Sequence, residues 1–357
     1  MRGIEARRER LAGLLELPLL VAGLPRVAGG QVNVRYLTGL SSSNAALLVE
    51  PDGSATLYTD FRYAPRARQV EGVEVVETPR ELLPAVAALL AGRRIAFEAE
   101  HLPYASYQAL REAGVDPVPA SGLVESLRAV KDADEIAAVR RAGALSDEVF
   151  AALAGERFSG RSERELAWWV ERRFREAGAE ALSFPAVVAA GEGGSIPHAV
   201  PGERVIAEGM LVTVDAGCVL DGYCSDCTRT FAVGAVSARL RELHALCLEA
   251  QLAGLAAVEP GARARDVDAA ARAVLEAAGL GPAFGHGLGH GVGLEIHEAP
   301  ALRPESEDVL QPGNVVTVEP GIYLSGEGGV RIEDLVLVTP GGHERLTQFP
   351  KELTVVG

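Results

Sequence analysis

Four acidic residues at repeated positions give this 357-residue sequence its clearest chemical signal. Asp215 and Glu319 each follow the tripeptide Val-Thr-Val, and Asp226 and Glu333 each lie in the next strand-like segment along the chain. One such acid alone would be interpreted as a solvent-facing residue at a strand end, because carboxylates are rarely buried unpaired. Four of them favour a shared site, and carboxylates gathered in one site repel one another unless cations hold them.

Two divalent ions would balance the charge of four carboxylates. A pair of ions that share ligands can hold and activate a water molecule for hydrolysis. Oxygen ligands with one imidazole suit Mn²⁺, Co²⁺, Fe²⁺ or Zn²⁺ better than they suit a thiolate zinc site. We therefore expect a cofactor of two divalent metal ions, with Mn²⁺ favoured and Co²⁺ or Zn²⁺ as alternatives.

A glycine-rich segment offers the imidazole. His286, His290 and His297 are three of the chain's seven histidines, and five of residues 285–293 are glycine. So many glycines disfavour a helix and let the backbone approach other groups closely. His286 has two interpretations: an outer group that orients the site, or a core histidine satisfied by hydrogen bonds.

The elements that must position these residues divide into two parts. The first 125 or so residues alternate short strands and helices, which predicts a small α/β domain. The predicted strands are 19–22, 45–49, 56–59, 73–77 and 94–98. The predicted helices are one that ends near Leu17, then 81–91 and 104–113. A boundary near 121–131 gives domains 1–125 and 126–357.

The second part repeats one order of elements, two helices followed by paired strands. The first pair of helices starts at capping boxes, at Asp132 and Ser162, and runs to about Leu153 and to Gly178. The second pair covers 238–258 and 265–278, and the strands are 186–190, 211–216, 223–233, 315–319 and 330–338. Thr228 shares one face of its strand with Asp226, since side chains alternate. The whole chain is predicted to be α/β (α+β).

An internal duplication explains the repeated acids. Asp215 and Glu319 are 104 residues apart, and Asp226 and Glu333 are 107 apart. We expect a duplicated domain with a pseudo-twofold axis, whose strands curve around the shared site.

Charge and cysteine usage exclude several classes of protein. Thirty-four basic and 49 acidic residues leave a net charge of −15, which repels phosphate backbones and argues against a nucleic-acid partner. Four cysteines are too few for a disulfide framework. Residues 7–24 begin like a signal peptide, but Glu16 and Pro18 interrupt the apolar run. Since no apolar run would span a bilayer, we expect a cytoplasmic protein without a membrane partner.

The ordered motifs resemble those of the pita-bread metallopeptidases, and among these the Xaa-Pro peptidases prolidase and aminopeptidase P. The motifs are Asp-Ala-Gly from Asp215, Ser-Asp-x-Thr-Arg-Thr-Phe from Ser225, Gly-His-Gly-x-Gly-His from Gly285, Val-Glu-Pro-Gly from Val318 and Val-Arg-Ile-Glu-Asp from Val330. Asn33-Val-Arg-Tyr-Leu-Thr-Gly extends the likeness to a creatinase-type N-terminal domain, so it covers nearly the whole chain.

The resemblance implies a function and a set of site residues. The implied metal ligands are Asp215, Asp226, His290, Glu319 and Glu333, with Asp226 and Glu333 bridging the ions. The implied catalytic and substrate-contacting residues are His198, His297, Glu319 and Arg331. The implied reaction is hydrolysis of the Xaa-Pro bond of dipeptides or short peptides, and a homodimer is expected from the resemblance alone.

Three alternatives stay open. The protein could be an aminopeptidase P that acts on longer peptides, a metal-free hydrolase of the same fold, or a binding module without catalysis. A dipeptidase must bind the substrate's C-terminal carboxylate, which an arginine does best. Many prolidases carry that arginine at the position of Ala301, where this sequence has none. Arg35 is the favoured substitute, with Arg62 and Arg303 as the others, and prolidase is slightly preferred.

Overall fold

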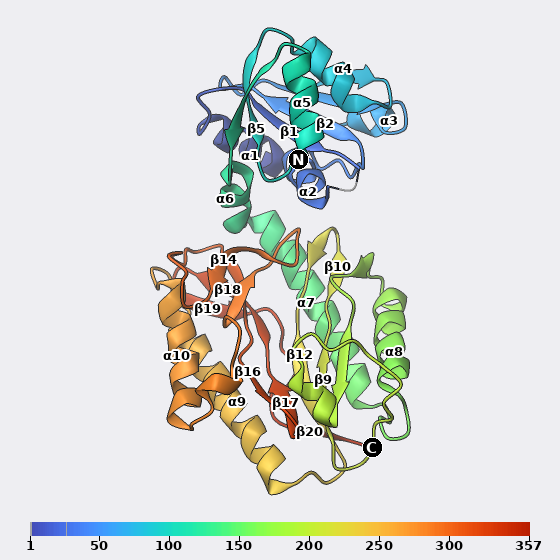
Figure 1. Ribbon diagram of the computed structural model, residues 1–357, viewed down its shortest axis with the longest axis vertical. Helices are drawn as coiled ribbons and strands as arrows, with labels where there is room; N and C mark the ends of the chain where they lie inside the picture. The colour runs from blue at the N-terminus through green and yellow to red at the C-terminus, as the bar shows by residue number, and fades with distance from the viewer. Residues whose placement is uncertain (1, 26) are drawn as a thin grey trace. The chain divides into compact units, whose positions relative to one another are not determined.

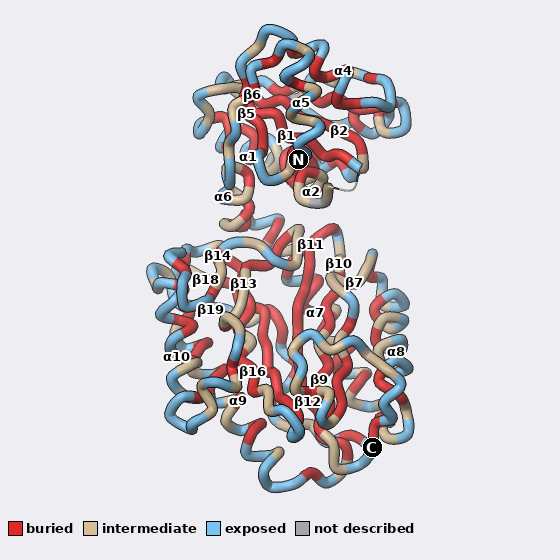
Figure 2. The backbone as a smooth tube through the Cα atoms, in the orientation of Figure 1, coloured by how far each residue is buried: buried red, intermediate tan, exposed pale blue. Residues whose placement is uncertain are grey.

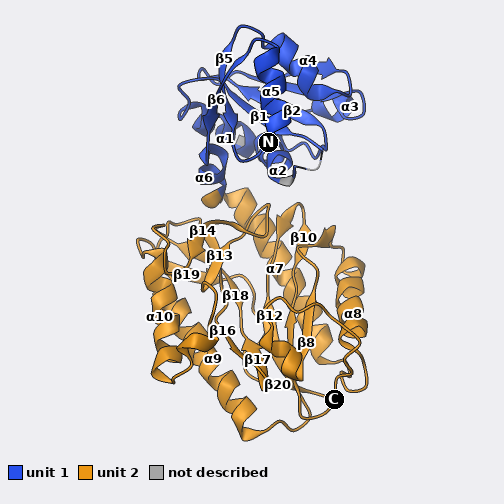
Figure 3. Ribbon diagram, in the orientation of Figure 1, with its two compact units in different colours: residues 1–128 blue, residues 129–357 orange. Residues whose placement is uncertain are grey.

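The computed structural model describes residues 2–25 and 27–357, which form two compact units (Figure 3). The first unit extends to Arg128 and the second begins at Ala129. Helix α6, Leu123–Ala129, therefore spans the boundary predicted at 125/126. Each unit is described below by itself. Within the described residues, no helix is both long and apolar enough to cross a membrane.

The first unit is built on a six-stranded mixed sheet in the order β4-β3-β2-β1-β5-β6. Its strands are β1 Leu19–Gly23, β2 Ala45–Val49, β3 Ala55–Asp60, β4 Glu74–Thr78, β5 Arg94–Glu98 and β6 Asp116–Ala120. Its helices before α6 are α1 Arg2–Ala12, α2 Ala28–Thr38, α3 Ala64–Ala67, α4 Leu82–Leu89 and α5 Tyr104–Glu112. The central strands β1 and β2 are buried along their whole length, as expected where both faces of a sheet are covered.

The sequence predicted five of these six strands to within about a residue, but it missed β6, α2, α3 and α6, and the first helix ends at Ala12 and not near Leu17. Strand β6 contains Pro117 and Pro119, which argue against a strand, but it lies at an edge of the sheet where missing N–H groups are tolerated. Helix α2 begins with Gly29 and Gly30, which are poor helix formers. A side chain at Gly30 would collide with the Ala22 carbonyl, so close packing requires the glycine there.

The second unit consists of two similar halves. The first half has α7 Ala133–Ala154 and α8 Glu163–Glu176, and both helices start at the predicted capping boxes. Its strands are β7 Ala181–Leu182, β8 Val187–Ala190, β9 Leu211–Asp215, β10 Cys218–Leu220, β11 Tyr223–Cys224 and β12 Thr228–Val233, with a 3₁₀ helix η1 at Gly191–Ser195. Strands β8, β9 and β12 form a sheet with the C-terminal β20, Thr354–Val356.

The second half repeats the arrangement with α9 Ala238–Ala257 and α10 Ala264–Ala277. Its further elements are η2 Gly281–Ala283, β13 Gly289–Gly291, β14 Glu298–Leu302, β15 Val315–Val318, β16 Gly321–Leu324, β17 Gly328–Arg331, β18 Asp334–Thr339 and β19 Gly342–Arg345. The sheet order is β14-β13-β15-β18-β19. Figure 1 shows α8 flanking the strands on one side and α9 and α10 on the other. The predicted creatinase-type domain and duplicated second domain are therefore confirmed as a fold.

The two predicted strands that carry Asp226 and Glu333 are not continuous, which corrects the sequence interpretation. The segment 223–233 divides into β11 and β12, and the segment 330–338 divides into β17 and β18. Asp226 lies in the first gap and Glu333 in the second. A residue outside the hydrogen-bonded ladder is free of strict side-chain alternation, so the breaks allow both carboxylates to turn toward one site.

Each half buries its own apolar core between its sheet and its helices. One cluster joins α7 and α8 to β8, β9 and β12 through residues such as Phe150, Phe174 and Phe231. The other joins α9 and α10 to β15–β18 through residues such as Leu243 and Val336. Figure 2 shows the buried strands inside and the exposed faces on the helices. Packing against the helices therefore holds the strands in place, and the predicted site residues lie at the ends and breaks of these strands.

Candidate metal centre

The four predicted acids lie at the ends or breaks of strands from the two halves. Asp215 is the last residue of β9 and pairs in register with Thr228, while Glu319 directly follows β15. The Glu333 backbone N–H donates to the Thr228 carbonyl at 3.1 Å, which joins the halves at the site. The Thr228 hydroxyl donates to Glu333 Oε2 at 2.7 Å. Thr228 therefore contacts the acidic cluster and Asp226 belongs to it, although Asp226 precedes β12 and does not lie on that strand.

His290 completes the cluster from β13. Its Nε2 lies 3.3 Å from Glu319 Oε1 and 3.6 Å from Asp226 Oδ2. Its Nδ1 lies 3.1 Å from the Gly291 carbonyl, which can only accept, so Nδ1 carries the proton and Nε2 is the free ligand atom. Ligand atoms of Asp226, His290 and Glu333 all lie within 4.8 Å of one another.

The carboxylates are arranged for a cation. Burial, then the charges of Glu333, Asp215 and Glu319, raise the pKa of Asp226 well above its ordinary value. Burial and the charges of Glu319 and Asp215 do the same to the pKa of Glu333. Asp215 Oδ1, Asp226 Oδ1 and Glu333 Oε1 are buried without a hydrogen-bond partner among the described residues. Divalent ions would supply the missing partners and relieve the repulsion, so these residues fit the implied cofactor.

Arg331 organises the residues around the acids. Its Nη2 donates to Asp215 Oδ2 at 2.7 Å and its Nε donates to the Thr228 hydroxyl at 3.2 Å. Its Nη1 donates to the Pro197 carbonyl at 3.2 Å, in the loop that carries His198. Burial, the largest single effect, would lower the pKa of Arg331, but Asp215, Tyr323 and Glu319 together outweigh it and raise the pKa well above its ordinary value. Arg331 is therefore a permanent cation that orients one acid and one loop.

His286 lies outside the ligand set and contacts Tyr323, which the sequence analysis missed. The Nδ1 of His286 donates to the Gly287 carbonyl at 2.8 Å, so its Nε2 accepts from the Tyr323 hydroxyl at 2.8 Å. That hydroxyl accepts from Arg331 Nη1 at 2.9 Å. Both ring nitrogens of His286 are thus satisfied by hydrogen bonds, and Tyr323 connects the ring to Arg331; its role in orienting the site stays a prediction. In the sequence, the only indication of a role for Tyr323 near the site was its position four residues after Glu319.

The residues of the cluster line a pocket of about 670 Å³. His198 and His297 line it, and the His297 ring centroid lies 4.2 Å from that of His290. Apolar walls come from residues such as Phe184 and Ile296. The described geometry therefore combines a group of residues that could hold divalent ions with room for a small apolar substrate.

The three arginines considered for the substrate carboxylate have different environments. Arg303 lines the pocket of the metal centre. Arg62 belongs to the first unit, where its Nε and Nη2 bind Asp60 at 2.8 and 2.7 Å. Because Asp60 is fully buried, this pair is a structural contact of that unit. Arg35 lies on α2 of the first unit and is partly buried.

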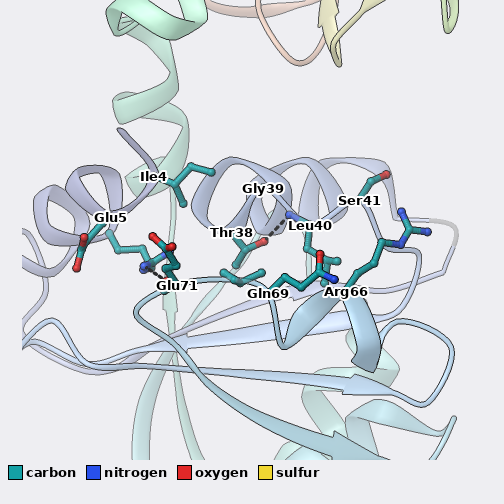
Figure 4. Close-up of a pocket in the computed structure, with 11 residues that line it drawn as sticks. Ile4, Glu5, Thr38, Gly39, Leu40, Ser41, Arg66, Gln69 and Glu71 are labelled. Atoms are coloured by element: carbon teal, nitrogen blue, oxygen red, sulfur yellow. Dashed lines mark hydrogen bonds between the residues drawn. The ribbon is translucent and has the colours of Figure 1, made fainter. Parts of the chain in front are cut away.

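The first unit contains a separate pocket of about 280 Å³, between α1, the end of α2 and the segment after α3 (Figure 4). Arg8 donates to the Leu37 carbonyl at 2.8 Å and to the Glu71 carbonyl at 2.7 Å. This arginine therefore joins three segments of the chain. None of the predicted site residues lines this pocket in the part of the chain that the structure describes.

Comparison with known proteins gives the class that this fold and site define. The sequence matches the metallopeptidase family M24 over residues 137–340 and the creatinase/prolidase N-terminal domain over residues 27–130. The chain belongs to the M24 metallopeptidase family, as the motifs predicted.

Three relatives cover nearly the whole chain. The structure of an Xaa-Pro dipeptidase from Bacillus anthracis is 39% identical, with a TM-score of 0.93 over 99% of this chain and 100% of that chain. An Xaa-Pro dipeptidase from Pyrococcus furiosus is 35% identical over 329 residues, 90% of this chain and 92% of its own length. The structure of an X-Pro aminopeptidase from Thermotoga maritima is 31% identical, with a TM-score of 0.90 over 97% and 100% of the two chains.

Proposed function

We propose that this protein is an Xaa-Pro dipeptidase that uses two divalent metal ions, with Mn²⁺ as the expected metal. The observation that carries the proposal is a set of three buried carboxylate oxygens that have no hydrogen-bond partner among the described residues. Together with His290, their residues line a pocket of about 670 Å³, which has room for a dipeptide. The likeness to two Xaa-Pro dipeptidases along most of the chain supports the substrate class.

Asp215, Asp226, His290, Glu319 and Glu333 would hold the ions, with Asp226 and Glu333 shared between them. When bound, the ions would supply Lewis acidity and a water molecule activated for attack. Arg331 would keep Asp215 charged and oriented. Thr228 would orient Glu333 through the 2.7 Å hydrogen bond described above.

The Xaa-Pro bond is a tertiary amide whose nitrogen carries no hydrogen, so that nitrogen must receive a proton as it leaves. In the proposed mechanism Glu319 accepts a proton from the attacking water and passes it toward the prolyl nitrogen. His198 donates a hydrogen bond to the carbonyl oxygen as negative charge develops there. His297 lies against the proline ring.

The second candidate is an aminopeptidase P that acts on longer peptides. It is favoured by the structural likeness to the X-Pro aminopeptidase from Thermotoga maritima and by the absence of an arginine at position 301. A metal-free hydrolase and a binding module are disfavoured, because either would leave the buried carboxylate oxygens without partners.

Comparing three substrates separates these candidates. The purified chain, supplied with Mn²⁺, is incubated with Ala-Pro, Ala-Pro-Ala and Ala-Gly, and kcat/KM is measured for each. A dipeptidase cleaves Ala-Pro fastest and Ala-Gly slowly. Faster cleavage of Ala-Pro-Ala identifies an aminopeptidase P, and no cleavage of either proline peptide rejects both functions.

Cellular location and assembly belong to the proposal as well. All four cysteines are free, buried thiols, which supports a reducing, cytoplasmic environment. The net charge of −15 supports the absence of a nucleic-acid partner, and no membrane partner is expected. A homodimer is proposed from the family resemblance, and sedimentation of the purified chain tests it.

A further inference from the structure

Arg303 directly follows strand β14 and lines the pocket that the proposed metal ligands also line. In the antiparallel pair of β13 and β14, Ala301 lies directly opposite His290 and Leu302 lies opposite Gly289. Directly opposed side chains share one face of a sheet, and residues two apart on a strand share it as well. An arginine at position 301 would therefore share a face with His290. Arg303 lies two residues beyond that position, after the paired strand has ended, and lines the same pocket as Ala301.

The backbone around Arg303 is fixed by local contacts. A Cβ at Gly287 would lie 2.8 Å from the Arg303 Cβ, so the two segments touch there only because residue 287 is glycine. The Ser306 N–H donates to the Arg303 carbonyl at 3.0 Å, and the Ala301 N–H donates to Asp308 Oδ2 at 3.0 Å. Asp308 therefore contributes to closing the turn that follows Arg303.

The guanidinium of Arg303 is available, unlike that of the other arginine in the pocket. Arg331 is buried and bound to Asp215, Thr228 and Tyr323. Arg303 is exposed, lines the same pocket, and forms no ion pair with any of residues 2–25 or 27–357. The lining of the pocket thus combines the acidic cluster with an arginine that forms no ion pair within the described residues.

We propose that Arg303 binds the C-terminal carboxylate of the substrate and thereby selects dipeptides, an inference that rests on the proposed Xaa-Pro dipeptidase function. In an Xaa-Pro dipeptide the carboxyl carbon is only two bonds from the nitrogen of the scissile bond. The carboxylate must therefore enter the pocket beside the metal ligands, where it loses hydrating water and needs a charged partner. Arg303 supplies the compensating charge and a planar fork that matches a carboxylate.

A comparison of Ala-Pro with Ala-Pro amide tests this contact, because the two substrates share the scissile bond and differ only in the terminal charge. The value of kcat/KM is measured on both for wild type, Arg303→Ala, Arg35→Ala and Arg241→Ala. Arg241 is exposed on α9 and serves as the control for loss of one positive charge.

Wild type should prefer the acid over the amide by about tenfold or more, and Arg303→Ala should bring that ratio close to one. Arg303→Ala should lose kcat/KM on Ala-Pro but still cleave Ala-Pro amide, and this retained cleavage shows that the variant is folded. Arg241→Ala should keep the wild-type ratio. An unchanged ratio in Arg303→Ala, or a collapse confined to Arg35→Ala, overturns the proposal. Failure of wild type to cleave either substrate rejects the dipeptidase function itself.

Discussion

Thr228 shows how a residue without charge can decide the geometry of a metal centre. Its hydroxyl donates to Glu333 Oε2 and accepts from Arg331 Nε, so it links one proposed ligand to the cation that orients another. From the sequence, the alternation of side chains along a strand predicted that Thr228 and Asp226 lie on the same face. In the structure Asp226 lies in a strand break, so strand alternation does not relate the two residues. Thr228 contacts the centre through its hydrogen bonds with Glu333 and Arg331.

Thr228→Val should weaken metal binding about 10–100-fold, because Glu333 loses the donor that fixes its orientation. Thr228→Ser keeps the hydroxyl and should retain most of the affinity. Competition with a chromophoric chelator measures both variants. Equal affinities of the valine variant and wild type would show that Thr228 has no part in positioning the ligand.

Asp226→Ala should abolish turnover of Ala-Pro and reduce bound metal from two ions per chain, since this acid is proposed to be shared by both ions. Elemental analysis of the purified variant gives the stoichiometry, and circular dichroism checks the fold. Two bound ions together with full activity in the folded variant would reject the assignment of Asp226.

Among the secondary-structure elements, the sequence predicted the order of strands and helices better than it predicted where strands are interrupted. The five strands of the first unit and the long helices of the second followed from periodicity and capping boxes. The strand breaks at Asp226 and Glu333 were not predicted, because the apolar alternation continues through them and only tertiary pairing reveals the gap. The contact of Tyr323 with His286 and Arg331 was missed for a similar reason, since a neutral side chain gives no charge pattern.

Glycines in the segment before His297 are needed for close packing at some positions only. A Cβ at Gly289 would lie 2.0 Å from the Thr317 carbonyl oxygen, between β13 and the end of β15. Gly289→Ala should therefore cost roughly 1–3 kcal/mol of unfolding free energy and weaken metal binding by displacing His290. Gly285 is exposed with no atom near its Cβ position, so Gly285→Ala is the matched control. Equal denaturant midpoints of the two variants would contradict this packing argument.

The Asn33 motif joins elements of the first unit through a buried polar cluster. The amide of Asn33 donates to Glu98 on β5 and to Glu125 on α6, and its carbonyl accepts from Arg128. His101 Nε2 lies 2.8 Å from Glu125 Oε1. Burial, and then the negative charge of Glu125, raise the pKa of Glu98 to about 8.

The folded unit therefore holds a proton on Glu98 that the unfolded chain releases above pH 4.5, its ordinary pKa. Stability should fall as the pH rises from about 4.5 to 8, by up to about 1.4 kcal/mol per pH unit from this group. Glu98→Gln cannot ionise and should flatten that part of the curve. Glu112→Gln, at an exposed position, is the control. Parallel curves of unfolding midpoint against pH for wild type and Glu98→Gln would contradict the assignment.

At the scale of the whole molecule, duplication explains why one site needs both halves of the second unit. Each half buries its own core, and each contributes two acids from the inner ends of its strands. The spacings of 104 and 107 residues were visible in the sequence, so the convergence of the acids was predictable. The place of Arg303 in the pocket was not predictable, because it depends on tertiary packing at the end of β14.

The central claim is that this convergence creates a dimetal site for Xaa-Pro dipeptides, and a metal titration tests it most directly. Chelated, metal-free protein is titrated with Mn²⁺ while free proline released from Ala-Pro is measured at each step. Without metal no proline should be released, and the rate should reach its plateau at two ions per chain. Full-rate release of proline by the chelated protein, or no release at any occupancy, would contradict this claim.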